Sequence, residues 1–254
     1  MPHHFDFLVL GGGSAGYASA RTAREFCDRV AIVDGSGELG GLCILQGCMP
    51  SKTLIYSTEV LHLARQGEKF GLRIPRAEID MDALQARKRH WVADFADYRR
   101  EQLESDRFTL YRQHGRFIGP QEIELEDGTR IQADRIMVAT GSVVNSPPLP
   151  GLADVPAWTS DDILDLESVP ESVLVLGGGI IASELGQFLA RAGSRVTLIQ
   201  RGDHILREAG EPAARVVEEA FRSEGMEVFT GTGIQAVEET PRGIRVAFSH
   251  EGNT

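Results

Sequence analysis

Residues 5–26, FDFLVLGGGSAGYASARTAREF, decide the fold class, because an apolar run leads through a glycine turn into a run of small residues. Its glycines fit the spacing G-x-G-x-x-G at Gly11, Gly13 and Gly16. The flanking patterns predict a strand before this turn and a helix after it. Residues 29–35, RVAIVDG, supply a second apolar strand that ends in Asp34, 23 positions after Gly11. The sequence therefore predicts a dinucleotide-binding α/β unit.

Each part of this unit suits a bound dinucleotide. Glycines let the backbone approach a pyrophosphate closely, and the N-terminus of the following helix offers free N–H groups and a partial positive charge. Asp34 can accept hydrogen bonds from a ribose. We expect Ser14, Ala15 and Gly35, which flank the turn and the acid, to lie beside the ligand. A glycine-rich turn without a ligand is the alternative.

The same plan occurs a second time in residues 171–202, ESVLVLGGGIIASELGQFLARAGSRVTLIQRG. The three motif positions are held by Gly177, Gly179 and Ala182. Gln200 stands where the first unit has its acid, Arg201 follows it, and Arg207 is close by. An acid there would repel a 2′-phosphate, whereas an arginine would bind it. The second unit is therefore predicted to prefer NADPH to NADH, with an ordinary solvated role for Arg201 as the alternative.

Two dinucleotide units in one chain predict two nucleotides, and flavin with nicotinamide is the expected pairing, since one reduces the other by hydride transfer. The predicted fold is α/β, with two Rossmann-like FAD/NAD(P)-binding units of the three-layer ββα type. We predict an FAD-binding domain in residues 1–150 and an NAD(P)-binding domain in residues 151–254. The proline-rich SPPLPG at 146–151 is predicted as the linker between them.

Between the two glycine motifs, residues 50–66 and 76–105 are predicted as helices. An apolar stripe in the second of these is interpreted as core packing; it consists of Ile79, Leu84, Trp91, Phe95, Tyr98 and Leu103. From residue 107, polar and apolar residues alternate, which predicts a small antiparallel sheet inserted before the strand RIMVATG at 135–141. The cofactor is expected to lie close to four small residues, Gly115, Ala139, Thr140 and Gly141.

The composition limits the function classes. With 254 residues, 42% of them hydrophobic and 25% charged, the chain has the composition of a soluble globular protein. A net charge of −11 argues against a general nucleic-acid surface. No apolar run reaches the roughly 18 residues that span a membrane, and the N-terminus lacks a secretory signal pattern. We therefore expect a cytoplasmic protein that acts on a small molecule.

Residues 40–52, GGLCILQGCMPSK, contain two of the three cysteines, Cys43 and Cys48. Structural zinc usually takes four ligands in two close pairs, and the chain has no second cysteine pair, so we predict no metal. A purely structural disulfide would close a very short loop and constrain the unfolded chain little. A redox-active pair fits better, although neither alternative is eliminated by the residues alone.

Several neighbours of the cysteines favour redox chemistry. Gly40 and Gly41 permit close approach to a flat cofactor, and Pro50 suits the first turn of a helix. A helix N-terminus and the ammonium group of Lys52 both stabilise a thiolate, which is the species that attacks disulfides.

In chain order, LGGGSAG, the cysteine segment, ATG and LGGGIIASE resemble the class I pyridine nucleotide–disulfide oxidoreductases, the family of dihydrolipoamide dehydrogenase, glutathione reductase and mercuric reductase. The resemblance covers essentially the whole chain. It implies FAD in the first unit, with Cys48 next to the flavin and Cys43 as the thiol that exchanges with substrate. Leu42 stands where the family usually has threonine.

The same resemblance implies roles for residues of the second motif. Lys52 would lie near the flavin and pair with Glu184, the acid of GGGIIASE. Ile180 falls where many relatives carry an aromatic residue that gates the nicotinamide pocket, and Ile181 follows it. The gate here would be aliphatic.

By this resemblance, electrons pass from NAD(P)H through FAD to the Cys43–Cys48 disulfide, and on to a disulfide or thiol-reactive substrate. Full-length relatives are homodimers whose C-terminal domain supplies a catalytic His-Glu pair, and we expect this chain to stop before that domain. Two alternatives remain. One is NAD-linked oxidation of dihydrolipoamide, and the other is a flavin-binding module without complete catalysis.

Overall fold

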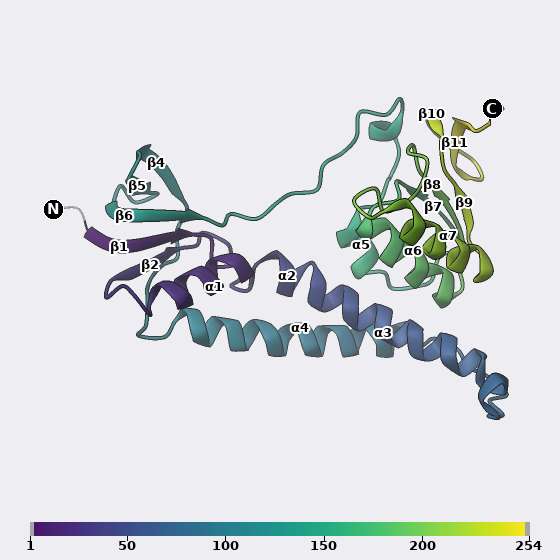
Figure 1. The fold of residues 1–254 in the computed structure, drawn as a ribbon, viewed down its shortest axis with the longest axis horizontal. Helices are drawn as coiled ribbons and strands as arrows, with labels where there is room; N and C mark the ends of the chain where they lie inside the picture. The colour runs from purple at the N-terminus through teal and green to yellow at the C-terminus, as the bar shows by residue number, and fades with distance from the viewer. Residues whose placement is uncertain (1–2, 252–254) are drawn as a thin grey trace. The chain divides into compact units, whose positions relative to one another are not determined.

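The computed structural model of the chain describes residues 3–251 and consists of two compact units (Figure 1). The first unit contains Met1–Ser51 and Arg87–Val143, and the second contains Lys52–Ala86 and Val144–Thr254. Residues 52–86 therefore pack with the second unit. The predicted domain boundary at residue 150 had placed them in the first domain. Two helices, α3 (Cys48–Arg65) and α4 (Met81–Leu103), have residues in both units.

The first unit is built on a six-stranded mixed sheet in the order β3-β2-β1-β6-β5-β4 (Figure 1). Its strands are β1 (His3–Leu10), β2 (Val30–Val33), β3 (Thr109–Tyr111), β4 (Gly115–Gly119), β5 (Glu122–Leu125) and β6 (Arg130–Val138). The first three strands and β6 pair in parallel, and β4, β5 and β6 pair antiparallel. The α/β fold is confirmed, and the predicted antiparallel strands extend the edge of the parallel sheet.

The core of the first unit follows from its apolar strands. Leu8, Val9 and Ile32 on β1 and β2 are completely buried. Helix α1 (Ser14–Ala23) packs against these two strands through small side chains, among them Ala20. Because small residues let a helix approach the sheet closely, the glycine turn is held at the carboxyl end of β1.

The second unit contains a parallel sheet in the order β7-β8-β9 and a separate hairpin, β10-β11. The bounds of its elements are η1 (Gly67–Phe70), η2 (Leu152–Asp154), α5 (Ser160–Leu164), β7 (Ser172–Leu176), α6 (Ile180–Ala192), β8 (Arg195–Ile199), α7 (Glu211–Ser223), β9 (Glu227–Phe229), β10 (Gly233–Thr240) and β11 (Gly243–Ser249). Phe188 and Leu189 of α6 are buried against this sheet, together with Leu54 of α3. Residues 139–151 contain no helix or strand.

The apolar stripe predicted for α4 is only partly a core element. Leu84 and Leu103, near the two ends of the helix, are buried and join the hydrophobic clusters of the second and first unit respectively. Trp91, Phe95 and Tyr98 between them are 40%, 41% and 59% exposed. The core interpretation is therefore wrong for the middle of the helix, because helical periodicity alone does not show which part of a long helix meets a core.

Residues 3–251 lack two kinds of feature. No helix in this part of the chain is long and apolar enough to cross a bilayer. Nor does it contain a group of three or more His, Cys, Asp or Glu side chains that could hold a metal ion.

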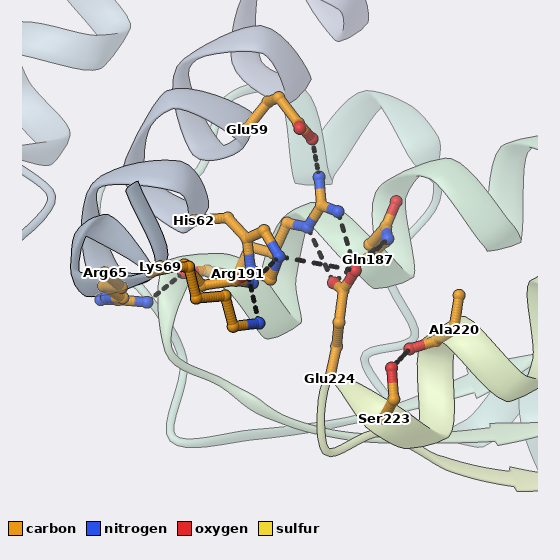
Figure 2. Close-up of polar contacts among 10 residues, drawn as sticks. Glu59, His62, Arg65, Lys69, Gln187, Arg191, Ala220, Ser223 and Glu224 are labelled. Carbon is orange, nitrogen blue, oxygen red and sulfur yellow. Dashed lines mark hydrogen bonds and ion pairs between the residues drawn. The ribbon is translucent and has the colours of Figure 1, made fainter. Parts of the chain in front are cut away.

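A buried ion pair joins three helices of the second unit (Figure 2). Arg191 on α6 donates two hydrogen bonds, of 2.7 and 2.8 Å, to the carboxylate of Glu224, which follows α7. Glu59 on α3 pairs with the same guanidinium, and Gln187 donates to Glu224 at 3.1 Å. The Arg191 and Glu224 side chains are only 11% and 13% exposed. Such a pair fixes helix positions and is costly to break.

The pKa values of Arg191 and Glu224 shift in the directions that keep both side chains charged. Hydrogen bonds to Glu224 raise the pKa of Arg191, against the effect of burial. Burial works to raise the pKa of Glu224, but the hydrogen bonds and charge of Arg191 outweigh it, and the pKa lies below its ordinary value of 4.5.

Replacing Glu224 with glutamine is expected to lower the free energy of unfolding by about 2 to 3 kcal/mol near pH 7, because Arg191 then loses its more buried anion and keeps only Glu59, which is 42% exposed. A carboxylate whose pKa is lower in the folded than in the unfolded protein stabilises the fold at pH values above the unfolded pKa, here 4.5. That stabilisation is lost as the pH falls through the pKa of the folded state. The difference between wild type and Glu224→Gln should therefore shrink in acid. Urea titrations over a pH series would measure it.

The matched control is Glu59→Gln, since Glu59 contacts the same guanidinium but is 42% exposed. Its effect is expected to stay below about 1 kcal/mol. Equal losses in the two variants would contradict the buried-pair interpretation.

Candidate functional site

The first glycine turn presents unsatisfied backbone donors at the start of α1. Gly13 is the N-cap residue of this helix, and no side chain caps the first turn. Gly16 lies directly against the carbonyl oxygen of Gly11, where any side chain would collide. The exposed Ser14 and Ala15 occupy the first helical positions. The arrangement fits the pyrophosphate of a dinucleotide, because free N–H groups and the helix dipole point to the same place.

Asp34 is buried at the end of β2, beneath this turn. The Gly12 backbone N–H donates to Asp34 Oδ2 at 2.6 Å, and the Ser36 backbone N–H donates to Oδ1 at 2.8 Å. The carboxylate is thus fixed at the turn, where the sequence predicts a ribose contact. These hydrogen bonds explain how its orientation is held.

The cysteine segment rests on the glycine turn by backbone contact. Gly41 has a φ of +70°, and a Cβ atom at this position would lie 2.4 Å from the Cα of Gly13. Helix α2 (Gly41–Leu45) begins here and carries Cys43. The chain then turns back, so that a Cβ at Gly47 would lie 3.2 Å from the Cα of Cys43. Two glycine contacts therefore place the thiol segment beside the predicted phosphate site.

The two cysteines differ in exposure. Cys43 is half-buried, whereas Cys48 is exposed and is the first residue of α3. No disulfide joins the two cysteines in this structure. A cysteine at a helix N-terminus lies in the positive end of the helix dipole, which favours its anionic form. Lys52 follows one helical turn later on the same helix.

Within the second unit, Lys52 Nζ donates a hydrogen bond to Glu184 Oε2. The two residues are 132 positions apart in the sequence, on α3 and α6. Their side chains are 55% and 35% exposed, so solvent weakens the attraction. The contact orients the ammonium group rather than stabilising the fold strongly.

The second glycine turn repeats the hydrogen-bond pattern of the first with an uncharged acceptor. The Gly178 backbone N–H donates to Gln200 Oε1 at 3.1 Å, and Gln200 Nε2 donates to the carbonyl oxygen of His204 at 3.3 Å. Gly179 is the N-cap residue of α6, again without a side-chain cap, and Gly177 has a φ of +99°. Gln200 therefore holds the turn and the loop that follows β8.

That loop carries the two arginines that the sequence predicts to bind the 2′-phosphate of NADPH. Arg201 and Arg207 are both exposed. The completely buried Glu218 of α7 fixes the loop from below, because its carboxylate accepts a 3.1 Å hydrogen bond from the Ile205 backbone N–H. Ile180 and Ile181, the predicted gate and its neighbour, are exposed at the start of α6.

The remaining predicted residues line the first unit in different ways. Gly35 lies against the ring of His114, and Gly115 packs tightly against Ile123. The Ala139 backbone N–H donates a 2.8 Å hydrogen bond to the carbonyl oxygen of Leu10, which places Thr140 beside the glycine turn. Three further predicted residues are found as follows: Gly40 buried before α2, Leu42 exposed on α2, and Gly141 exposed with a φ of +78°.

Sequence reasoning missed Arg99. Its guanidinium carbon lies 4.3 Å from the centroid of the Tyr17 ring, and two of its nitrogens are buried. In the sequence, Arg99 is one of several arginines on a charged helix and does not differ from its neighbour Arg100. Only the packing of α4 on α1 distinguishes the two.

Comparisons with known proteins agree with this geometry. The mercuric reductase of Bacillus cereus is 33% identical over 93% of this chain, which covers 37% of that protein. A dihydrolipoyl dehydrogenase of Bacillus subtilis is 31% identical over 92% of this chain and 52% of its own length. The chain thus spans about half, or less, of the length of these relatives.

Among solved structures, the HOCl-induced flavoprotein disulfide reductase RclA from Escherichia coli has the same fold, with a TM-score of 0.79 at 22% identity over 97% of this chain and 53% of that one. Residues 5–254 match the family described as pyridine nucleotide-disulphide oxidoreductase. The chain, with its two glycine turns and its cysteine segment, belongs to this family of oxidoreductases.

Proposed function

We propose that this chain carries the electron path of an FAD-dependent disulfide reductase that uses NADPH and the Cys43–Cys48 pair. The contact of Gly41 with Gly13 is the observation that carries the proposal, because it fixes a reactive thiol segment on a dinucleotide-binding turn. By family resemblance, the complete protein is a cytoplasmic homodimer. We infer that its substrate is a disulfide or a thiol-reactive compound, and the mercuric ion in the name of the Bacillus cereus relative is an example of the second kind.

The first unit offers a consistent set of groups for FAD. The N–H groups at the start of α1 would hold the pyrophosphate, and Asp34 would meet the ribose. The backbone around Gly41 and Thr140 would border the rest of the cofactor. FAD, when bound, supplies a two-electron carrier between a nicotinamide and a disulfide.

The cysteines perform the exchange. The Cys43–Cys48 disulfide takes up two electrons, supplied by NADPH through the flavin, and two protons, and its sulfur–sulfur bond opens to give two thiols, each in equilibrium with its thiolate. The Cys43 thiolate attacks a substrate disulfide, breaks its sulfur–sulfur bond, releases one thiol after protonation, and forms a mixed disulfide. Cys48 then attacks Cys43, which restores their bond and releases the second thiol. The position of Cys48 at the start of α3 favours its anionic form in this last step.

Lys52 and Glu184 serve to place a positive charge near this chemistry. Lys52 lies one turn after Cys48 on α3, and its contact with Glu184 restricts an otherwise flexible side chain. The helix that carries Glu184 begins at the second glycine turn. The pair therefore links the predicted nicotinamide-binding helix to the helix that begins with the redox thiol.

The preference for NADPH rests on charge after β8. Gln200 is neutral and engaged with the glycine turn, whereas Arg201 and Arg207 are exposed on a loop that Glu218 anchors. Guanidinium groups suit a 2′-phosphate, which the NADH ribose lacks. The relatives named dihydrolipoyl dehydrogenase support a second candidate, NAD-linked oxidation of dihydrolipoamide. The coenzyme preference distinguishes the two.

The purified chain is expected to bind FAD and to have its flavin absorbance bleached faster by NADPH than by NADH, because the loop after β8 offers arginines and no acid. Anaerobic stopped-flow spectra with each coenzyme would measure this. A chain that binds no flavin would contradict the proposal, and faster bleaching by NADH would favour the dihydrolipoamide candidate.

Cys48→Ser is expected to abolish the long-wavelength absorbance that a thiolate gives beside an oxidised flavin, because serine has no comparable anion at neutral pH. Cys43→Ser should keep this band, and Cys27→Ser serves as the control for a half-buried cysteine outside the site. Titration of the reduced variants with FAD would show the band directly. Its persistence in Cys48→Ser would reverse the assigned roles of the two thiols.

Arg201→Ala is expected to weaken NADPH binding by about tenfold, the loss of one charge-assisted contact, and to leave NADH binding unchanged. Arg195→Ala, at the opposite end of β8, is the matched control, since Arg195 is exposed and pairs with Glu171. Calorimetric titration of both coenzymes would measure the difference. An unchanged NADPH affinity would show that Arg201 is only a solvated strand-end residue.

A further inference from the structure

The loop that follows β8 contains a residue in a backbone conformation that side chains rarely adopt. Leu206 has a φ of +51°, in the left-handed region that favours glycine. A leucine persists there only where its surroundings hold it, and such strained residues are typical of ligand-binding segments. The next residue is Arg207, one of the two arginines predicted to bind the 2′-phosphate of NADPH. The contacts that hold Leu206 therefore also fix the backbone position of Arg207.

Two hydrogen bonds hold this strained turn. The Leu206 backbone N–H donates to the carbonyl oxygen of Gly178 at 2.6 Å, which ties the loop to the second glycine turn. The backbone N–H of the completely buried Ile205 donates to Glu218 Oε1 at 3.1 Å, which ties the loop to α7. The Gly178 N–H is itself engaged with Gln200. The arginine loop and the second glycine turn are thus joined by hydrogen bonds into one body, with Glu218 as its side-chain support.

The carboxylate of Glu218 is held in place by its own helix. The side chain is completely buried, so water does not stabilise its charge. Two arginines of α7 do so instead, with Arg215 Nη1 3.0 Å and Arg222 Nη1 3.4 Å from Glu218 Oε2. The hydrogen bond to Glu218 is the largest of the effects that raise the pKa of Arg215. One carboxylate oxygen is therefore occupied by the helix, and the other accepts the hydrogen bond from the loop.

We propose that Glu218 is a positioning residue for coenzyme choice, which acts through the Ile205 N–H to hold the loop in the shape that lets Arg207 bind the 2′-phosphate of NADPH. The inference rests on the proposed function in taking NADPH as the coenzyme. Glu218 touches no ligand itself, because it is completely buried. Without this support the strained Leu206 turn relaxes, and the loss falls on the 2′-phosphate contact, which NADH lacks.

Glu218→Asp separates the hydrogen bond to the loop from the charge. Arg215 and Arg222 are half-buried and can follow a carboxylate that is one methylene shorter, whereas the Ile205 backbone N–H cannot. Without nucleotide, amide hydrogen exchange at Ile205 is expected to become about tenfold faster relative to Leu198 on the central strand β8. Nuclear magnetic resonance of the full chain would measure both amides. Equal acceleration at the two amides would indicate general destabilisation and would overturn the inference.

Adenosine 2′,5′-bisphosphate and adenosine 5′-monophosphate measure the 2′-phosphate contact directly, because they differ only in that phosphate. Wild type is expected to bind the bisphosphate more tightly, and Glu218→Asp should lower the ratio of the two affinities by about tenfold, the loss of one charge-assisted contact. Calorimetric titration would give both affinities, and damage to the glycine turn cancels in their ratio. Glu211→Gln is the matched control that should leave the ratio unchanged, since Glu211 also pairs with Arg215 but is 63% exposed.

Double variants show whether Glu218 acts through Arg207. In that case Glu218→Asp has little further effect on the ratio once Arg207 is replaced by alanine. Its effect should add fully to that of Arg201→Ala. Arg201 directly follows Gln200, whose backbone N–H donates to the carbonyl oxygen of Phe229 at 2.8 Å, so its position does not depend on Glu218. Full additivity with Arg207→Ala as well would overturn the inference.

Failure of this inference is distinguishable from failure of the proposed function. A wild type that binds the two adenosine phosphates equally would contradict the proposed coenzyme, and the role of Glu218 with it. A wild type that prefers the bisphosphate, beside a folded Glu218→Asp variant with the same preference, would overturn the inference alone. Thermal unfolding identifies the folded variants. Should the aspartate variant not fold, Glu218→Gln keeps a neutral acceptor of roughly half the strength, and its expected effect is a loss of about threefold; an unchanged ratio would again overturn the inference.

Discussion

The close contact between Gly41 and Gly13 is the constraint on which the geometry of the first unit depends. A single methyl group at position 41 would come within 2.4 Å of the Gly13 backbone, and the φ of +70° already disfavours other residues. The segment before α2 can therefore rest on the turn before α1. Cys43 on α2 and Cys48 at the start of α3 follow from it. Backbone contact, which is stiffer than side-chain contact, thus sets where the thiols lie.

The two glycine turns solve one structural problem with two different residues. In each, the middle glycine N–H donates to the side chain that follows the second strand, which is Asp34 in the first unit and Gln200 in the second. Either oxygen can hold the turn. The carboxylate adds a negative charge at the predicted ribose position, whereas the amide adds no charge beside Arg201. The same backbone geometry in the two turns is therefore compatible with a different nucleotide at each.

Local pattern was enough to predict the fold, because strands, glycine turns and helices are encoded within short windows. It also placed the cysteines at a helix start, where α3 begins at Cys48. Contacts over long sequence separations were different. The contact of Lys52 with Glu184 was expected only from family resemblance, and Arg99 has no distinguishing sequence feature. The exposed middle of α4, around Trp91, was misjudged because periodicity gives a face but not its partner.

Arg191 and Arg99 show how one residue type can be held by an ion pair in one place and by an aromatic ring in another. Arg191 in the second unit is largely buried with Glu224, whose carboxylate accepts two hydrogen bonds from the guanidinium. This ion pair holds α6 to the end of α7. Arg99 in the first unit is half-buried over an aromatic ring, and its enclosed Nε and Nη1 atoms have no hydrogen-bond partner in the described part of the chain. The Arg191 guanidinium is stabilised by a carboxylate, whereas the Arg99 guanidinium is stabilised by cation–π attraction. The difference between the two arginines therefore lies in their partners.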